Sequence, residues 1–210
     1  MSSTPALEIK NLEAWYGESH VLHGVDMVVQ PGEVVTLLGR NGAGKSTTLK
    51  TIAGVIAPDG GEVWIEGHSL AQAPQVAKAR LAYVPDNCLA SPQQTGRGLL
   101  EQVAAEKGVA VDDAVLDLAA RLGLEPHLDK RFEQMSTGTR RKVYLTAAAL
   151  GDPAVVVADG PSNGLDAQAR GVLADVFKTW GQTRVVLFAS HDPELVQACG
   201  ARTVNVTDLR

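Results

Sequence analysis

The sequence contains little cysteine, no long apolar run and no cluster of basic residues. Its only cysteines, Cys88 and Cys199, are too few for a disulfide framework and lack the spacing of a metal site. No apolar stretch approaches the roughly 20 residues needed to cross a bilayer, and the first residues lack the apolar segment of a secretory signal. We therefore expect a cytoplasmic protein with reduced cysteines, and any function at a membrane requires a second, membrane-spanning chain.

Charge is modest and mildly acidic. Nineteen Lys and Arg residues against 24 Asp and Glu residues give a formal net charge of −5 at pH 7. Because no Lys/Arg-rich block is present, we expect no nucleic-acid partner. The length of 210 residues suits one large domain, or a core with an inserted subdomain.

The most informative motif is GRNGAGKST at residues 39–47. It matches G-x-x-x-x-G-K-[ST], in which glycines let backbone N–H groups approach a polyphosphate, and the following helix points its positive end at the same group. Residues 33–38 indicate a buried strand entering the loop, and residues 47–53 the helix leaving it. The motif predicts binding of a nucleoside triphosphate, with Lys45 on the β- and γ-phosphates and Ser46 on Mg²⁺. The predicted binding residues of the loop are Gly39, Asn41, Gly42, Gly44, Lys45, Ser46 and Thr47.

Short Val-rich runs alternate with helical patterns, which is typical of a sheet covered on both faces. Strands are expected at residues 7–12, 25–29, 33–38, 61–65, 81–84, 154–158, 185–190 and 202–206. The first, second and fourth alternate in polarity near Gly, Pro and Asp turns and predict an antiparallel β-subdomain. Between residues 86 and 135 helical spacing replaces the strand pattern. The expected fold is therefore a single α/β domain with a core at 1–85 and 136–210 and an all-helical subdomain at 86–135.

Further candidate site residues follow in a definite order. Asp159 ends an apolar strand, and such an aspartate holds Mg²⁺ through water in P-loop nucleotidases. Ser136 and Gly138, in MSTGT, precede a helical pattern at 140–150, so they form either a second anion site or a plain Ser N-cap. Tyr16 is either a stacking partner for adenine or an ordinary aromatic residue, and His191 is either catalytic or a structural hydrogen-bonding group.

Taken in this order, the motifs resemble those of the ATP-binding subunits of ABC transporters over essentially the whole chain. By similarity, GRNGAGKST stands at Walker A, VVVAD at Walker B, MSTGT at the signature and NGLD, with Asp166, at the D-loop. His191 stands at the switch histidine, Tyr16 at the A-loop aromatic and Asp86 at the Q-loop. Residues 7–70 are similar to branched-chain amino-acid importer subunits, whereas the part from Tyr83 onward is similar to export-type subunits.

The resemblance implies a P-loop NTPase with a RecA-like core, and ATP and Mg²⁺ as cofactors. It also implies a head-to-tail dimer with a second ATP-binding subunit, identical or different, in which each ATP lies between the Walker motifs of one chain and Ser136 and Gly138 of the other. Movement of this dimer would drive a separate transmembrane permease subunit, so the chain would lie peripherally at the inner face of a membrane. Asp166 joins the expected nucleotide contacts, and Ser46, Asp159 and Asp86 are the expected metal residues.

The chain departs from the family pattern at four positions. The family has a glutamate after the Walker B aspartate, where it polarises the attacking water, but here the residue is Gly160. Asp86 replaces the Q-loop glutamine, and Thr137 and Thr139 replace signature residues. Because a general base contributes typically 10²–10⁴-fold to a rate, we expect ATP binding with slow hydrolysis. His191 and Asp86 are the remaining catalytic candidates, and Gly160→Glu is predicted to raise ATPase activity.

Two other functional interpretations remain open. A nucleotide-gated clamp or regulator would use ATP-dependent dimerisation as its output, and the loss of the base would keep such a dimer closed. A soluble P-loop kinase of small metabolites would account for the phosphate loop but leaves MSTGT, NGLD and SHD unexplained. The leading interpretation is the transporter subunit.

Overall fold

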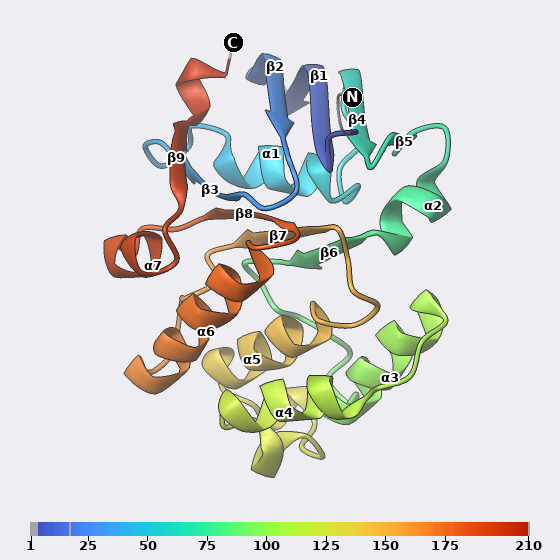
Figure 1. Ribbon diagram of the computed structural model, residues 1–210, viewed down its shortest axis with the longest axis vertical. Helices are drawn as coiled ribbons and strands as arrows, with labels where there is room; N and C mark the ends of the chain where they lie inside the picture. The colour runs from blue at the N-terminus through green and yellow to red at the C-terminus, as the bar shows by residue number, and fades with distance from the viewer. Residues whose placement is uncertain (1–3, 17, 210) are drawn as a thin grey trace.

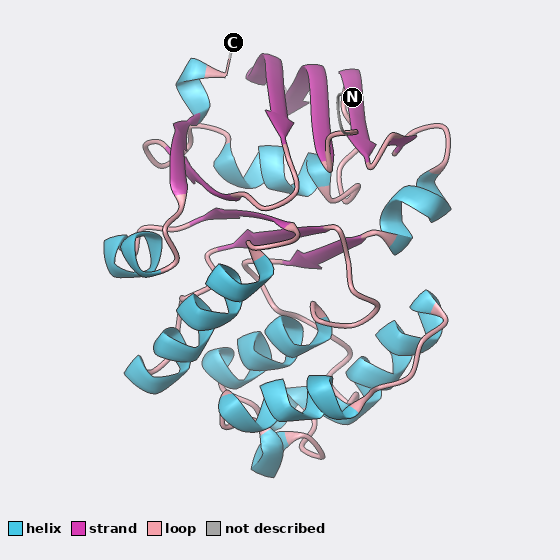
Figure 2. Cartoon of the chain, in the orientation of Figure 1, coloured by secondary structure: helices cyan, strands magenta, loops and turns pink. Residues whose placement is uncertain are grey.

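A computed structural model describes residues 4–16 and 18–209 of the chain, and the side chain of Tyr16 lies outside what it describes. The described part contains two sheets and seven α-helices, arranged in layers (Figures 1 and 2). The antiparallel sheet has the order β2-β1-β4-β5, formed by β1 (Leu7–Tyr16), β2 (Ser19–Val29), β4 (Gly60–Ile65) and β5 (His68–Ser69). The second sheet is parallel, in the order β6-β7-β8-β3-β9, formed by β6 (Leu81–Val84), β7 (Val155–Asp159), β8 (Val185–Ala189), β3 (Val34–Leu38) and β9 (Arg202–Asn205).

One helix lies between the two sheets, and others cover the outer face of the parallel sheet. Figure 1 shows α1 between the antiparallel and the parallel sheet, with α5, α6, α3 and α4 on the far side of the parallel sheet. The bounds are α1 (Lys45–Ile52), α2 (Pro74–Ala79), α3 (Gly96–Lys107), α4 (Asp113–Arg121), α5 (Thr137–Ala147), α6 (Ala167–Trp180) and α7 (Pro193–Ala198). Short 3₁₀ turns occupy Glu125–His127, Phe132–Gln134 and Val206–Asp208.

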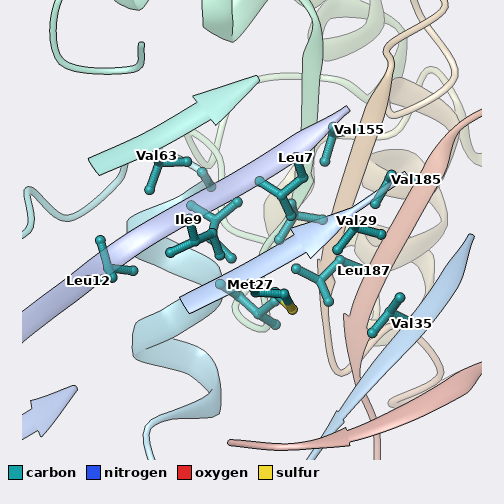
Figure 3. Close-up of a cluster of buried hydrophobic side chains, with 14 of the residues drawn as sticks. Leu7, Ile9, Leu12, Met27, Val29, Val35, Val63, Val155, Val185 and Leu187 are labelled. Carbon is teal, nitrogen blue, oxygen red and sulfur yellow. The ribbon is translucent and has the colours of Figure 1, made fainter. Parts of the chain in front are cut away.

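Alternating side chains of the parallel strands build two separate cores. In β7, Val155 and Val157 face the antiparallel sheet and α1, whereas Val156 and Ala158 face α6 on the other side, as the two-residue period of a strand requires. Figure 3 shows Val155 among the side chains that the two sheets share in the first core. A third cluster joins α3, α4 and α5. Every residue of β7 is buried, which explains why its sequence is a continuous apolar run.

The expected α/β architecture is confirmed, including the antiparallel sheet built from the first, second and fourth predicted strands. Several element bounds were wrong. The first strand continues to residue 16 and the second begins at residue 19, because cross-strand pairing continues as far as Tyr16 and Ser19 in one long hairpin. The helices predicted at 47–53 and 140–150 begin earlier, at residues 45 and 137, and β5 and α2 were not predicted. The domain boundary at residue 135 stays a prediction, although α5 contributes to both the second and the third cluster.

Both cysteines are free and buried in this arrangement. Burial raises the pKa of the Cys88 thiol to about 11, so it is protonated and unreactive at neutral pH. No helix in the described ranges has the length and apolar character to cross a bilayer.

Candidate functional site

A cavity of about 480 Å³ lies where the parallel strands β3, β7 and β8 end. This is the edge of an open α/β sheet at which ligands bind. Ten of the predicted site residues line the cavity, namely Asn41, Gly42, Gly44, Lys45, Ser46, Thr47, Asp86, Asp159, Gly160 and His191. Five further residues line it, namely Ser19, Val21, Asn163, Ala189 and Ser190, of which Asn163 and Ser190 belong to the NGLD and SHD motifs but were not predicted as site residues. The topology therefore brings the Walker A, Q-loop, Walker B and switch segments to one place.

The phosphate loop is shaped by Gly44, which precedes α1. Gly44 has a φ of +93° and lies so close to β2 that a Cβ atom would approach Val21 and Leu22 to 3.1–3.3 Å. Both the left-handed backbone and the close approach favour glycine. The loop carbonyls of Gly39 and Arg40 accept hydrogen bonds from the Lys45 ammonium, at 2.7 and 3.0 Å. The first N–H groups of α1 and this ammonium thus form a positively charged end of the cavity.

A carboxylate faces this positive end from β7. Asp159 is 6% exposed, and its Oδ2 atom is buried without a hydrogen-bond partner in the described part of the chain. Burial raises the pKa of Asp159, while the nearby Ser46 hydroxyl lowers it and the charge of Asp86 raises it further. A buried, unpartnered carboxylate oxygen beside a serine hydroxyl is a donor set that Mg²⁺ fits, because Mg²⁺ prefers hard oxygen ligands.

Gly160 follows this carboxylate and adopts a left-handed conformation with a φ of +55°. Its space is not open: a Cβ atom at residue 160 would lie 2.4 Å from Asn163 Nδ2 and 3.0 Å from Asp86 Oδ1. The amide of Asn163 donates a hydrogen bond of 3.2 Å to the same Asp86 oxygen. At residue 160 the chain therefore lacks the glutamate that the family has, and the side chains of Asn163 and Asp86 occupy the space where it would lie.

Arg141 was not predicted as a site residue, yet it connects two backbone segments that border the cavity. Its guanidinium, which is 1% exposed, donates to the backbone carbonyl of Asp86 at 2.6 Å and to that of Asp159 at 3.2 Å. Arg141 belongs to α5, so one buried side chain links the signature helix to the Q-loop and Walker B segments. The sequence offers no signal for this role, because Arg140, Arg141 and Lys142 are three adjacent basic residues. Only their positions around the helix decide which of them is buried.

The signature residues lie at the exposed start of α5. Ser136 is the N-cap, and its hydroxyl accepts the Thr139 N–H at 3.2 Å. Ser136 and Thr137 are exposed, whereas Gly138 is buried against the following loop. A Cβ atom at residue 138 would lie 2.2 Å from the Gly164 carbonyl oxygen. The plain N-cap is therefore present, and Gly138 has a packing role, while their predicted contacts with nucleotide stay predictions.

The other predicted residues lie away from the cavity lining. Asp166 caps α6 by accepting the Ala169 N–H at 2.8 Å, and it pairs with Lys142 at 3.0 Å. Hydrogen bonds to its carboxylate lower the pKa of Asp166. Gly39 contributes its carbonyl to Lys45 rather than a surface to the cavity. The predicted contact of Tyr16 with adenine falls on a side chain outside the described part of the structure.

The ABC transporter family profile matches residues 22–163, more than half of the chain. Among curated proteins, the chain is 33% identical over 193 residues to the Nod factor export ATP-binding protein I of Paraburkholderia xenovorans, covering 89% of this chain and 62% of that protein. It is 33% identical over 206 residues to the human phospholipid-transporting ATPase ABCA3, covering 95% of this chain but 12% of the relative. The chain thus spans less than two thirds of the length of these relatives.

A solved structure described as the ATP-binding subunit of an ABC transporter superposes with a TM-score of 0.82 at 31% identity, covering 91% of this chain and 82% of that one. The family match supports the resemblance that the sequence motifs indicate, and so does the geometry of the site. The chain belongs to the ABC transporter family of ATP-binding proteins.

Proposed function

We propose that this chain is the ATP-binding subunit of an ABC transporter and that it binds MgATP in the cavity between Lys45, Ser46 and Asp159. The observation that carries the proposal is the buried, unpartnered Oδ2 atom of Asp159 opposite the phosphate loop. An isolated ionised carboxylate is costly to bury, and a Mg²⁺ ion held with Ser46 would remove that cost. The ion would neutralise phosphate charge, and Lys45 would turn from the loop carbonyls to the β- and γ-phosphates.

Hydrolysis at this site is slow. The residue directly after Asp159 is Gly160 rather than a carboxylate, and the left-handed Gly160 has no side chain to orient water. His191 lines the same cavity and would hold the γ-phosphate or the attacking water. Loss of a general base typically costs 10²–10⁴-fold in rate, while binding through the loop is retained.

The functional unit is a head-to-tail dimer that drives a separate transmembrane permease subunit from the inner face of a membrane. The exposed Ser136 and Thr137, at the start of an 11-residue helix, supply free N–H groups for the ATP of the second subunit. Asp166 and Lys142 would shape the adjoining D-loop surface. Both curated relatives have names that describe export or lipid transport, which favours a transporter over an isolated clamp.

Separate measurements of ATP binding and hydrolysis test this proposal. A fluorescent ATP analogue with Mg²⁺ should bind the wild-type chain, and Lys45→Ala should weaken binding at least tenfold. Lys10→Ala, a change at an exposed lysine of β1, is the matched control and should leave binding unchanged. Equal binding by wild type and Lys45→Ala would overturn the assignment. A long-lived ATP-bound homodimer that needs no second protein would instead favour the clamp.

A further inference from the structure

The carboxylate of Asp86 occupies the space into which a side chain at residue 160 would project. β6 and β7 are neighbouring parallel strands, with Val84 opposite Ala158, so Asp86 and Gly160 follow their strands at adjacent points. The Oδ1 atom of Asp86 lies 3.0 Å from the position of a Cβ atom on residue 160. A carboxylate is therefore present beside the glutamate position, although it comes from another segment of the chain.

Two groups fix this carboxylate in place. Asn163 Nδ2 donates to Oδ1 at 3.2 Å, and Arg141 Nη2 lies 3.6 Å from the same oxygen while donating to the Asp86 carbonyl at 2.6 Å. Both contacts to the side chain involve Oδ1, so Oδ2 has no protein partner in the described part of the chain. The Asp86 side chain is 52% exposed and lines the cavity with Lys45. One oxygen is thus anchored and the other is available to a water molecule.

The other titratable groups of the cavity are less well placed to take a proton from a water molecule. Asp159 is buried, and its unpartnered oxygen is the predicted metal contact. His191 lies at the end of β8 and borders a second hollow next to α7, and no hydrogen bond fixes its ring in the described structure. Only Asp86 combines a carboxylate, a fixed orientation and a place beside residue 160.

We propose that Asp86 accepts the proton of the attacking water in this chain, and that Asn163 is the positioning residue that holds it. This inference rests on the proposed function, because it requires ATP in the cavity. In the step, the water oxygen forms a bond to the γ-phosphorus while the bond from that phosphorus to the bridging oxygen breaks. The electron pair of the broken bond leaves on ADP, and one water proton passes to Asp86 and then to solvent.

Single-turnover hydrolysis by the full chain, measured together with ATP affinity, tests the inference. Asp86→Gln installs the residue that the family has at the Q-loop, and it keeps an oxygen for a metal-bound water but removes the base. We expect a fall in the hydrolysis rate of at least tenfold, with ATP affinity within threefold of wild type and no recovery at saturating Mg²⁺. Asp129→Asn, a change at an exposed aspartate of a surface ion pair, is the matched control and should leave the rate unchanged. Melting temperatures exclude unfolding as the cause.

A double-mutant cycle tests the positioning role. Asn163→Ala should lower the hydrolysis rate about threefold to tenfold in the wild-type background and should have no further effect in Asp86→Gln, because the two residues act as one unit. An unchanged rate in Asp86→Gln, recovery of that variant by excess Mg²⁺, or a wild-type chain that binds ATP without hydrolysing it would each overturn the inference and leave the proposed function standing. Failure of the wild-type chain to bind ATP would overturn the proposed function itself.

Discussion

Restoring the glutamate at residue 160 requires a second change, because the space beside Gly160 is filled. In Gly160→Glu the new Cβ atom would lie 2.4 Å from Asn163 Nδ2, which is closer than non-bonded atoms approach. The φ of +55° adds roughly 1–2 kcal/mol for a residue other than glycine. Displacing the amide also breaks its hydrogen bond to Asp86, worth about 1 kcal/mol net. The single variant should therefore lose roughly 2–3 kcal/mol of stability, or about 4–12 °C in melting temperature.

The same geometry predicts how the ATPase activity responds. In Gly160→Glu the clash tilts the carboxylate away from the water, so only a small part of the 10²–10⁴-fold contribution of a base is expected. Asn163→Ser removes the amide that fills the space, so Gly160→Glu/Asn163→Ser should hydrolyse ATP at least tenfold faster than Gly160→Glu. The assay is single-turnover hydrolysis, with ATP affinity measured alongside.

Glutamine at residue 160 distinguishes the steric effect of a larger side chain from the chemical effect of a carboxylate. Gly160→Gln/Asn163→Ser carries the same backbone conformation and nearly the same volume without a carboxylate, and it should show no gain over Asn163→Ser. If Gly160→Glu alone matches the double variant, the steric reasoning is wrong. If the double variant hydrolyses no faster than its glutamine counterpart, the idea that the missing base limits the rate is wrong.

Three further substitutions test the architecture of the site. Gly138→Ala places a methyl group 2.2 Å from a backbone carbonyl and should cost at least 2 kcal/mol in urea unfolding, whereas Gly171→Ala meets no atom within 4 Å in α6 and should stabilise by about 0.5–1 kcal/mol. Arg141→Met leaves buried carbonyls without a donor and should cost roughly 2–4 kcal/mol, against at most about 1 kcal/mol for Arg97→Met in an exposed ion pair. Asp159→Asn should raise the melting temperature of the nucleotide-free protein by about 2–4 °C at pH 8, for a gain on the order of 1 kcal/mol. Burial makes the folded state bind the carboxyl proton more tightly than the unfolded state, so this gain should shrink as pH falls through the raised pKa; a difference that stays constant from pH 8 down to the lowest pH at which both proteins are folded would contradict it.

The sequence predicted the sheets well because each has a distinct periodicity. β7 is buried on both faces and reads as an uninterrupted apolar run, while β1 and β2 alternate, and these patterns separate a covered parallel sheet from a half-exposed antiparallel one. Strand ends were placed less well. Near the turn of the hairpin, Ala14 and Leu22 are buried while Trp15 is exposed, and cross-strand pairing extends both strands beyond the predicted residues.

The site was predictable only where a motif fixes both the residue and its place. The phosphate loop and Asp159 follow from local sequence, since the flanking strand and helix set their positions. Asn163 belongs to the NGLD motif, but its contact with Asp86 could not be found in this way, and neither could the role of Arg141. Asn163 matters because it meets Asp86, 77 residues earlier in the chain, and Arg141 because its helix turns it inward beneath two strand ends. Contacts of this range depend on the packing of α5 and the loop after β7 against the sheet.

Arg141 gives the signature helix a mechanical connection to the site of its own chain. Its guanidinium holds the carbonyls of Asp86 and Asp159, on neighbouring segments, and its position on α5 is five residues from Ser136. Movement of the exposed start of α5, where the second subunit would bind in the proposed dimer, is therefore expected to shift the Asp86 and Asp159 backbones. Since a buried charge with such partners is expensive to release, the segments should shift together. If the proposed dimer forms, its closure would reach the attacking water through Asp86. Arg141→Met should then reduce any acceleration of hydrolysis by a second subunit more than it reduces ATP affinity.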